Sequence, residues 1–354
     1  MLQSTRRSAF GLATIMTSAL GAALLLAAPA SAEGECRTWL PDFDTGCDRE
    51  SRHQNSVRPM SMPYLFEDPF VTTEAQFAYL YHEFGRRSVF GGGDLQVLAL
   101  QLRLAITDRL AFIATKDGLG ILRPDLEGRD VSPALTPGFD VLDDEEGFTD
   151  MTIGFKYALI DWRDKNFIFT PAIRYEIPMG NSSLFQGSGD GVFIPSGTAA
   201  WTSENGAFHV ITGLGAQLPV DEDENSTSIF YNLHLDYAVE LGGDDFVKAI
   251  VPFVELGGMT WVGNGDGGNN FKTNLGNLDL NTIQAATGTG SFEGYDFANL
   301  GSDDVAGNTV ATATVGLRVP MDYGISLGAA YERPITNRKD IFKQRFTFMA
   351  TYEY

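Results

Sequence analysis

The sequence predicts an all-β protein, a twelve-stranded antiparallel up-and-down transmembrane β-barrel. Three observations lead to this prediction. Apolar and polar residues alternate along many segments. The connections between these segments are alternately tight and long. No segment after Thr72 approaches the ~18 apolar residues of a spanning helix. A soluble β-sandwich is the alternative. It would show the same alternation but has no reason to sort its connections by length.

The alternation is clearest in SIFYNLHLDYAVEL, residues 228–241. Successive side chains of a strand point to opposite faces, so this stretch has an apolar face and a polar face. It exceeds the ~9–11 residues that a tilted strand needs to cross a bilayer. We interpret the apolar set as facing lipid and the ionisable set as lining a barrel interior; the apolar set is Ile229, Tyr231, Leu233, Leu235, Tyr237, Val239 and Leu241.

Similar segments predict twelve strands, at 73–85, 93–106, 108–118, 148–162, 165–178, 189–204, 206–219, 226–242, 245–262, 305–319, 321–333 and 340–354. Tight turns are expected at Thr107-Asp108, Arg163-Asp164, Asn205-Gly206, Gly243-Asp244 and Pro320-Met321. Longer loops are expected at 119–147, 179–188, 221–225 and 263–304. Bacterial barrels have short periplasmic turns and long extracellular loops. In the strand expected at 245–262, strict alternation would place the charges of Lys248 and Glu255 on opposite faces. Pro252 lies between them and predicts a bulge.

Charged side chains within the strands are expected to face the lumen, because Arg or Lys facing lipid at the midplane costs ~2–4 kcal/mol. Mixed pairs such as Arg174 with Glu176, or Arg318 with Glu332, fit a structural network of ion pairs. A selectivity constriction or gate is the second interpretation. The lumen-lining candidates are Arg103, Lys156, Arg174, Glu176, His234, Asp236, Glu240, Arg318, Glu332 and Arg345.

Residues 1–32 are expected to be a secretory signal peptide. Arg6 and Arg7 precede an apolar stretch, and Ala30-Ser31-Ala32 is a small-x-small cleavage site. A retained membrane helix and twin-arginine export are the alternatives. Cleavage removes two Arg and no acid, which leaves 23 basic against 46 acidic residues. This balance disfavours nucleic acid as a partner.

Residues 33–71 form a segment of little periodicity before the barrel, which spans 72–354. Cys36 and Cys47, the chain's two cysteines, are expected to form a disulfide in an oxidising compartment. No His cluster lies near them, so a metal site is not expected. The segment either fills the lumen or lies in the periplasm, and the sequence leaves both open.

The strand 340–354 alternates up to its last residue, Tyr354. A terminal aromatic of this kind resembles the signal that the bacterial barrel assembly machinery binds. This machinery, outer-membrane lipid and a small-molecule solute are the expected partners.

The long loop 263–304 has two features of its own. Its Gly, Asp and Asn residues can build a calcium site, although flexible loops share this composition. The stretch NTIQAATG is expected to be a short helix.

No catalytic constellation is found. No histidine has a Ser two residues on, and no G-x-S-x-G elbow occurs. We therefore expect no enzyme and no cofactor.

The segments FTDMTIGFKYALID (148–161), FIFTPAIRYEIPMG (167–180) and VPFVELGG (251–258) resemble the barrel family named for the meta-pathway of phenol degradation. The matching positions are Asp150, Gly154, Lys156, Tyr157, Pro178 and Gly180. The resemblance implies an outer-membrane location and transport of aromatic or other hydrophobic compounds.

The function expected from the sequence is passive passage of small molecules, hydrophobic or aromatic ones among them, across the outer membrane. The alternative is a closed barrel with a surface-binding or structural role through its acidic loops. The two differ in whether a continuous water path exists.

Overall fold

The computed structural model describes residues 53, 56–127, 140–242, 246–268 and 270–354. The expected signal peptide, Cys36 and Cys47 lie outside these residues. The wall consists of β1 (Glu74–Glu83), β2 (Gly93–Ala105), β3 (Leu110–Ala114), β4 (Gly118–Pro124), β5 (Glu145–Phe148), β6 (Met151–Tyr157), β7 (Ile160–Trp162), β8 (Phe167–Ile177), β9 (Val192–Thr202), β10 (Phe208–Pro219), β11 (Ser228–Tyr237), β12 (Val239–Glu240), β13 (Ala249–Trp261), β16 (Thr309–Pro320), β17 (Ile325–Pro334) and β18 (Gln344–Glu353).

These segments form a closed antiparallel barrel of twelve wall strands. Each of three groups makes one interrupted strand: β3 with β4, β5 with β6 and β7, and β11 with β12. β1 pairs with β2 on one side and with β18 on the other, which closes the sheet. The predicted fold class is confirmed.

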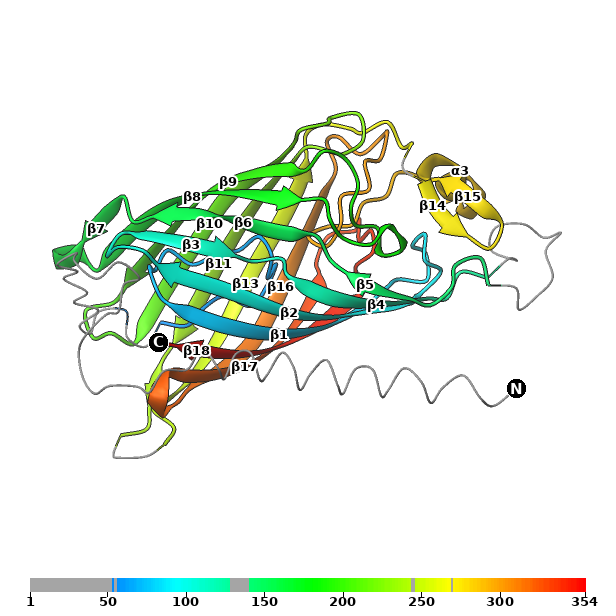
Figure 1. Ribbon diagram of the computed structural model, residues 1–354. Coiled ribbons are helices and arrows are strands. Elements are labelled where there is room, and N and C mark those ends of the chain that lie inside the picture. The colour runs from blue at the N-terminus through cyan, green and yellow to red at the C-terminus, as the bar shows by residue number, and fades with distance from the viewer. Residues whose placement is uncertain (1–52, 54–55, 128–139, 243–245, 269) are drawn as a thin grey trace.

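The barrel has two unlike ends (Figure 1). The C-terminus and the turns between β2 and β3, β9 and β10, and β16 and β17 lie at the end that we call the inner end. The long loops lie at the opposite, outer end, together with β14 (Asn270–Thr273), β15 (Gly276–Asp279) and α3 (Leu280–Thr287). Short turns are periplasmic in such barrels, so the inner end faces the periplasm.

The predicted short helix is present as α3. Asp279 caps it, because its carboxylate accepts a hydrogen bond from Thr282 N at 2.6 Å, and Gly288 ends it with a left-handed φ of 66°. In the described part of the chain, no helix is long and apolar enough to cross a membrane.

The third wall strand is longer than predicted. It continues beyond residue 118 as β4 to Pro124, and β5 begins at Glu145, so the loop is shorter than 119–147. The strand is interrupted at Lys116 and Asp117, where Lys116 Nζ forms an ion pair with Glu176 Oε1 at 2.8 Å.

The predicted bulge at Pro252 is wrong. The registers of β13 with β11, β12 and β16 run through this position without an extra residue. Lys248 lies before β13 begins, where it is exposed and lies 3.3 Å from Asp322 Oδ1. No bulge is needed to bring Lys248 and Glu255 to the same face, because the two residues do not share a strand.

Large apolar side chains cover the outside of the wall. On β11, Ile229, Tyr231 and Tyr237 are exposed, whereas Asn232, His234 and Asp236 are buried, as the alternation predicts. Other exposed side chains are Leu104, Phe155, Ile173, Leu214, Val254, Leu256, Val315, Leu317, Leu327 and Phe348. A closed sheet with an apolar exterior satisfies its backbone in hydrocarbon, and the protein is an outer-membrane barrel.

Candidate functional site: a lumen filled by residues 56–72

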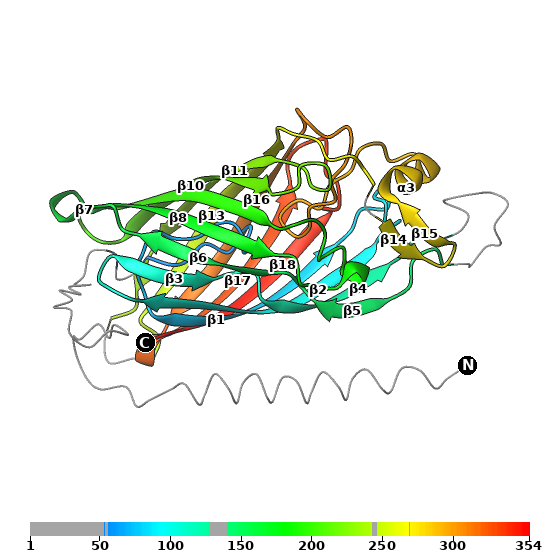
Figure 2. The same ribbon diagram turned by 45° about the horizontal axis from the view of Figure 1, so that its top comes forward.

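Residues 56–72, which we call the plug, lie inside the barrel (Figures 1 and 2, blue chain within the ring of strands). The plug starts at the inner end, where Val57 packs with Ala238, Ala249 and Val251. It returns to the same end, where β1 begins and Tyr354 N donates to Thr73 O at 2.9 Å. The plug is thus a loop that enters and leaves from the periplasmic side.

The tip of the plug is apolar and turns sharply. Met62 has a left-handed φ of 43°, and its carbonyl accepts hydrogen bonds from Leu65 N and Phe66 N, each at 2.9 Å. Met60, Met62, Leu65 and Phe66 are at most 4% exposed. Flexible Met side chains fill irregular gaps well, which suits a tip that packs against many wall strands.

The first anchor of the plug is a network of charges around Glu67. Its carboxylate lies 2.8 Å from Arg58 Nη1, Arg103 Nη2 and Lys156 Nζ. Asp68 joins the network, 2.6 Å from Arg58 Nη2 and 3.2 Å from Lys156 Nζ. All these groups are buried, so losing one partner would leave charges unpaired in a low dielectric.

The second anchor is Glu255 on β13. Its carboxylate accepts hydrogen bonds from Met60 N at 2.9 Å and Ser61 N at 2.6 Å. His234 Nδ1 lies 2.6 Å from the same carboxylate, and His234 Nε2 lies 2.9 Å from Asp236 Oδ2. Two wall strands thus position the group that holds the plug backbone.

The third anchor is Arg174, which donates to the carbonyl of Tyr64 at 2.7 Å and to that of Leu65 at 2.9 Å. The ion pairs expected of Arg174 with Glu176 and of Arg318 with Glu332 are not formed. Arg174 reaches the plug backbone instead, and Arg318 donates to Thr351 Oγ1 at 3.1 Å. Arg174 and Glu176 share one face of β8, whereas Arg318 and Glu332 lie on adjacent strands and are not opposite each other. Arg174 finds closer partners on the plug, and Arg318 finds one on β18.

The outer half of the lumen is occupied by the loop before β16. Arg345 Nη1 lies 2.9 Å from both carboxylate oxygens of Asp296, and Arg345 Nη2 lies 2.8 Å from Glu332 Oε2. Tyr295 is buried, and its hydroxyl lies 3.3 Å from Thr312 Oγ1. The lumen is therefore filled from both ends.

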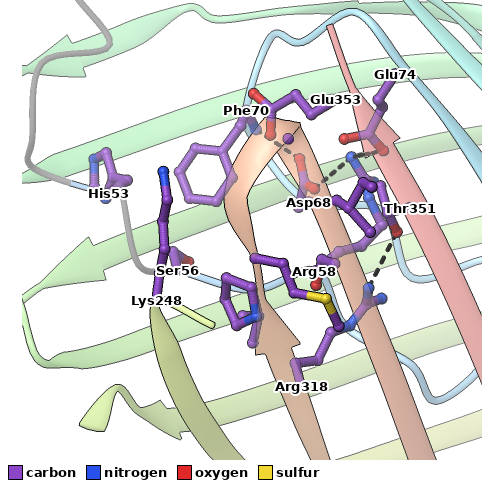
Figure 3. Close-up of a pocket in the computed structure, with 16 residues that line it drawn as sticks. His53, Ser56, Arg58, Asp68, Phe70, Glu74, Lys248, Arg318, Thr351 and Glu353 are labelled. Carbon is purple, nitrogen blue, oxygen red and sulfur yellow. Dashed lines mark hydrogen bonds and ion pairs between the residues drawn. The ribbon is translucent and has the colours of Figure 1, made fainter. Parts of the chain in front are cut away.

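A cavity of about 400 Å³ lies beside the plug at the inner end (Figure 3). Arg58, Asp68 and Glu74 meet on one side of it, and Arg58 Nη2 lies 2.7 Å from Glu74 Oε1. Arg318 and Thr351 line the cavity as well. The charged network around Glu67 thus extends to a water-accessible space facing the periplasm.

Nine of the ten lumen-lining candidates are buried within the barrel. Glu240 is the exception: it is exposed on β12, beyond the break at Ala238, at the inner end. The sequence reasoning missed the partners of these side chains, which are Glu67 and Asp68 on the plug, Glu255 on β13 and Asp296 in the outer loop. Two consecutive acids just before a barrel with a cationic interior were the available signal for the plug.

The residues that carry the family resemblance have structural roles. Asp150 Oδ1 accepts hydrogen bonds from Gly180 N at 2.8 Å and Gly187 N at 2.9 Å, so it ties two points of the loop between β8 and β9 to the break between β5 and β6. A Cβ on Gly154 would lie 2.1 Å from the carbonyl oxygen of Ile173. Lys156 anchors the plug, whereas Tyr157 is exposed on the outside. Pro178 follows β8 directly.

In the described ranges, no group of three or more potential metal ligands is found, and the calcium site considered for loop 263–304 gains no support. The disulfide, the signal peptide, the contact of Tyr354 with the assembly machinery and the absence of enzymatic activity stay predictions.

Solved structures similar to this chain are outer-membrane barrels. An outer-membrane channel of Pseudomonas putida F1 is 15% identical with a TM-score of 0.49, and the match covers 84% of this chain and 100% of that one. The NanC porin is 7% identical with a TM-score of 0.43, covering 80% and 99%. The KdgM porin in complex with disordered oligogalacturonate is 9% identical with a TM-score of 0.38, covering 79% and 99%. A search of curated proteins finds no match.

A family model described as "Putative MetA-pathway of phenol degradation" matches residues 68–276, which is more than half of the chain. The match includes Asp150, Gly154, Lys156, Tyr157, Pro178 and Gly180. Among them, Asp150 holds the loop between β8 and β9, Gly154 lets β6 and β8 approach closely, and Lys156 holds the plug. The chain belongs to this family of outer-membrane barrels.

Proposed function

We propose that the protein is an outer-membrane conduit for small molecules whose lumen is gated at the inner end by residues 56–72 and at the outer end by the loop before β16. The observation that carries the proposal is the kind of contact that holds the plug. Ion pairs and single side-chain hydrogen bonds attach it to the wall, whereas the wall itself is one continuous ladder of backbone pairs.

The plug has the attachment expected of a movable part. Among the described residues, its backbone-to-backbone hydrogen bonds are local, such as Leu65 N to Met62 O and Glu67 N to Leu65 O. No ladder joins it to a wall strand in these residues. Withdrawal of the plug would therefore leave the barrel pairings intact and would replace buried ion pairs with hydrated charges.

The outer half of the lumen favours solutes with apolar surface. Buried apolar side chains point inward from several strands there, among them Leu80, Val97, Phe230, Met259 and Trp261. They pack against apolar side chains of the loop before β16, such as Phe297 and Tyr295, which a passing solute would displace. Apolar walls with a few polar groups are typical of sites that bind hydrophobic small molecules. We therefore propose hydrophobic compounds, aromatic ones included, as the transported class.

The experiment is single-channel recording in planar bilayers of the mature protein and of a variant that lacks residues 33–71. We expect the mature protein to stay mostly closed and the deletion variant to show conductance steps interrupted by closures, because the loop before β16 still occupies the outer half of the lumen. A silent deletion variant whose barrel is folded, judged by its heat-dependent migration in gels, would contradict the gate. That result would favour the closed barrel that acts through its acidic outer loops.

The deletion variant should prefer anions. At the level of Glu67 it keeps Arg103, Lys156 and Arg174 on the wall without the plug's acids. We expect Lys156→Glu in this background to shift the reversal potential toward cations, because charges at a constriction set ion selectivity. An unchanged reversal potential would show that the ions pass elsewhere. Lys272→Glu, in the outer loop, is the matched control.

A further inference from the structure

A second cavity, of about 590 Å³, lies at the outer end of the barrel. Three stretches line it: Gly85–Ser88 between β1 and β2, residues 289–292 before β16, and residues 337–343 between β17 and β18. None of the residues that line it belongs to the plug.

The charge of this cavity is opposite to that of the protein. Its lining includes Arg86, Arg87, Arg338, Lys339 and Lys343, with Asp340 as the single acid among the lining residues. The whole chain has 25 basic and 46 acidic residues, and neighbouring outer loops carry runs of acids at 143–146 and 221–224. A concave surface of one sign concentrates oppositely charged molecules from solution.

Part of the cavity is pre-arranged and part is free. Arg338 is held by Asp340 at 2.8 Å, by the carbonyl of Ser291 at 3.0 Å and by the ring of Trp261, 5.4 Å from the guanidinium carbon. Arg86, Arg87 and Lys339 are exposed, and in the part of the chain that the structure describes no ion pair engages them. A fixed guanidinium beside free ones is an arrangement suited to an anion with several oxygens.

Phosphate fits this cavity better than carboxylate does. A phosphomonoester carries about −1.5 to −2 charge at pH 7 and three strong acceptor oxygens, whereas a carboxylate carries one charge and two oxygens. Ser88, Thr289 and Asn337 add neutral donors between the cations. The planar guanidinium group of arginine can donate two parallel hydrogen bonds to a phosphate, which further favours this ligand class.

We propose that the cavity between Arg86, Arg87 and Arg338 is a binding site for a phosphoryl group presented from the cell exterior. The group comes either from a soluble phosphorylated molecule or from a phosphorylated lipid headgroup in the outer leaflet. The two sources share the same recognition chemistry and are separated by experiment.

The test measures binding by the full mature protein in two settings. In nonionic detergent, inorganic phosphate is titrated calorimetrically. In nanodiscs of phosphatidylcholine with a small share of phosphatidic acid, enrichment of the phosphomonoester lipid around the protein is measured. Phosphate binding in detergent supports a soluble source, lipid enrichment without it supports a headgroup, and the absence of both overturns the proposal.

The double substitution Arg86→Gln/Arg87→Gln should weaken whichever binding is seen by about tenfold or more, because it removes two charged donors. Arg109→Gln, in the exposed turn between β2 and β3 at the inner end, is the matched control and should leave binding unchanged. Equal loss in both variants would show non-specific charge attraction, and unchanged binding in the double variant would overturn the site.

Asp340 provides a gain-of-binding test. Burial raises its pKa to about 7, and the guanidinium of Arg338 opposes this rise. Its φ of 45° is one that Asn tolerates. We expect Asp340→Asn to bind phosphate several-fold tighter than the wild type at pH 8, and this ratio to shrink at pH 6, where the wild-type carboxyl is largely protonated. Comparing the two proteins at each pH cancels the titration of phosphate itself, and a ratio below one at pH 8 would contradict the site.

Discussion

The Glu67→Gln protein is expected to conduct in planar bilayers under conditions in which the wild type is mostly closed. Glu67 is the common partner of Arg58, Arg103 and Lys156, all within 2.8 Å of its carboxylate. Removing one member of a buried ion network typically costs ~3–5 kcal/mol, since the remaining charges stay desolvated and unpaired. A loss of ~3 kcal/mol lowers the ratio of seated to released plug by a factor of ~10². Single-channel recording measures this directly as open probability.

Glu222→Gln is the matched control for this substitution. It removes the same charge from the exposed loop 221–225, far from the plug. The control protein should behave like the wild type. If both variants stay closed while their barrels are folded, loss of the ionic anchor is not enough to open the lumen, and Glu255, Arg174 and the loop before β16 become the remaining candidates.

Gly154→Ala is expected to prevent most of the protein from forming a folded barrel. Gly154 on β6 pairs with Arg174 on β8, and an added Cβ would lie 2.1 Å from the carbonyl oxygen of Ile173 and 2.6 Å from Arg174 Cα. These are backbone atoms of a neighbouring wall strand, so the strands must separate for the methyl group to fit. Overpacking usually costs ~1–3 kcal/mol, and we expect the upper end here because no flexible side chain can yield. The fraction of heat-modifiable barrel after refolding measures the effect.

Gly85→Ala serves as the comparison, because no atom lies within 4 Å of the position where its Cβ would be. It should refold like the wild type. Equal refolding yields for the two alanine variants would show that β6 and β8 can move apart at little cost, and would remove this explanation for a glycine in the family motif.

The wall of the barrel was predictable because its physics is local and periodic. The burial of successive side chains must alternate along a strand with lipid on one side, and it does so in β2, β8 and β11. Strand ends were less certain where the alternation weakens. Gly118 and Gly120 hide the continuation of the third strand into β4, since glycine carries no side chain to mark a face.

Only the wall residues of the candidate site were predictable, and their partners were not. Arg103, Lys156 and Arg174 could be assigned to the lumen because lipid excludes them. Their partners could not be assigned, because the plug has no periodicity and is bound partly through its backbone carbonyls and amides, which every sequence has. Glu255 was hidden by a different cause. Strict alternation places it on the face opposite to Lys248, and Lys248 lies outside the strand.

The course of the plug, in and out through the same end of the barrel, has a mechanical consequence. A chain that passed through the lumen from one end to the other could leave it only if all of its contacts with the wall were broken together. A loop with both ends on the periplasmic side can instead be peeled, one anchor after another, by a pull on the chain before Ser56. Breaking the anchors one after another needs less force at each step than breaking them together. The loop stays covalently attached to β1, so it can return to the lumen once the force is removed.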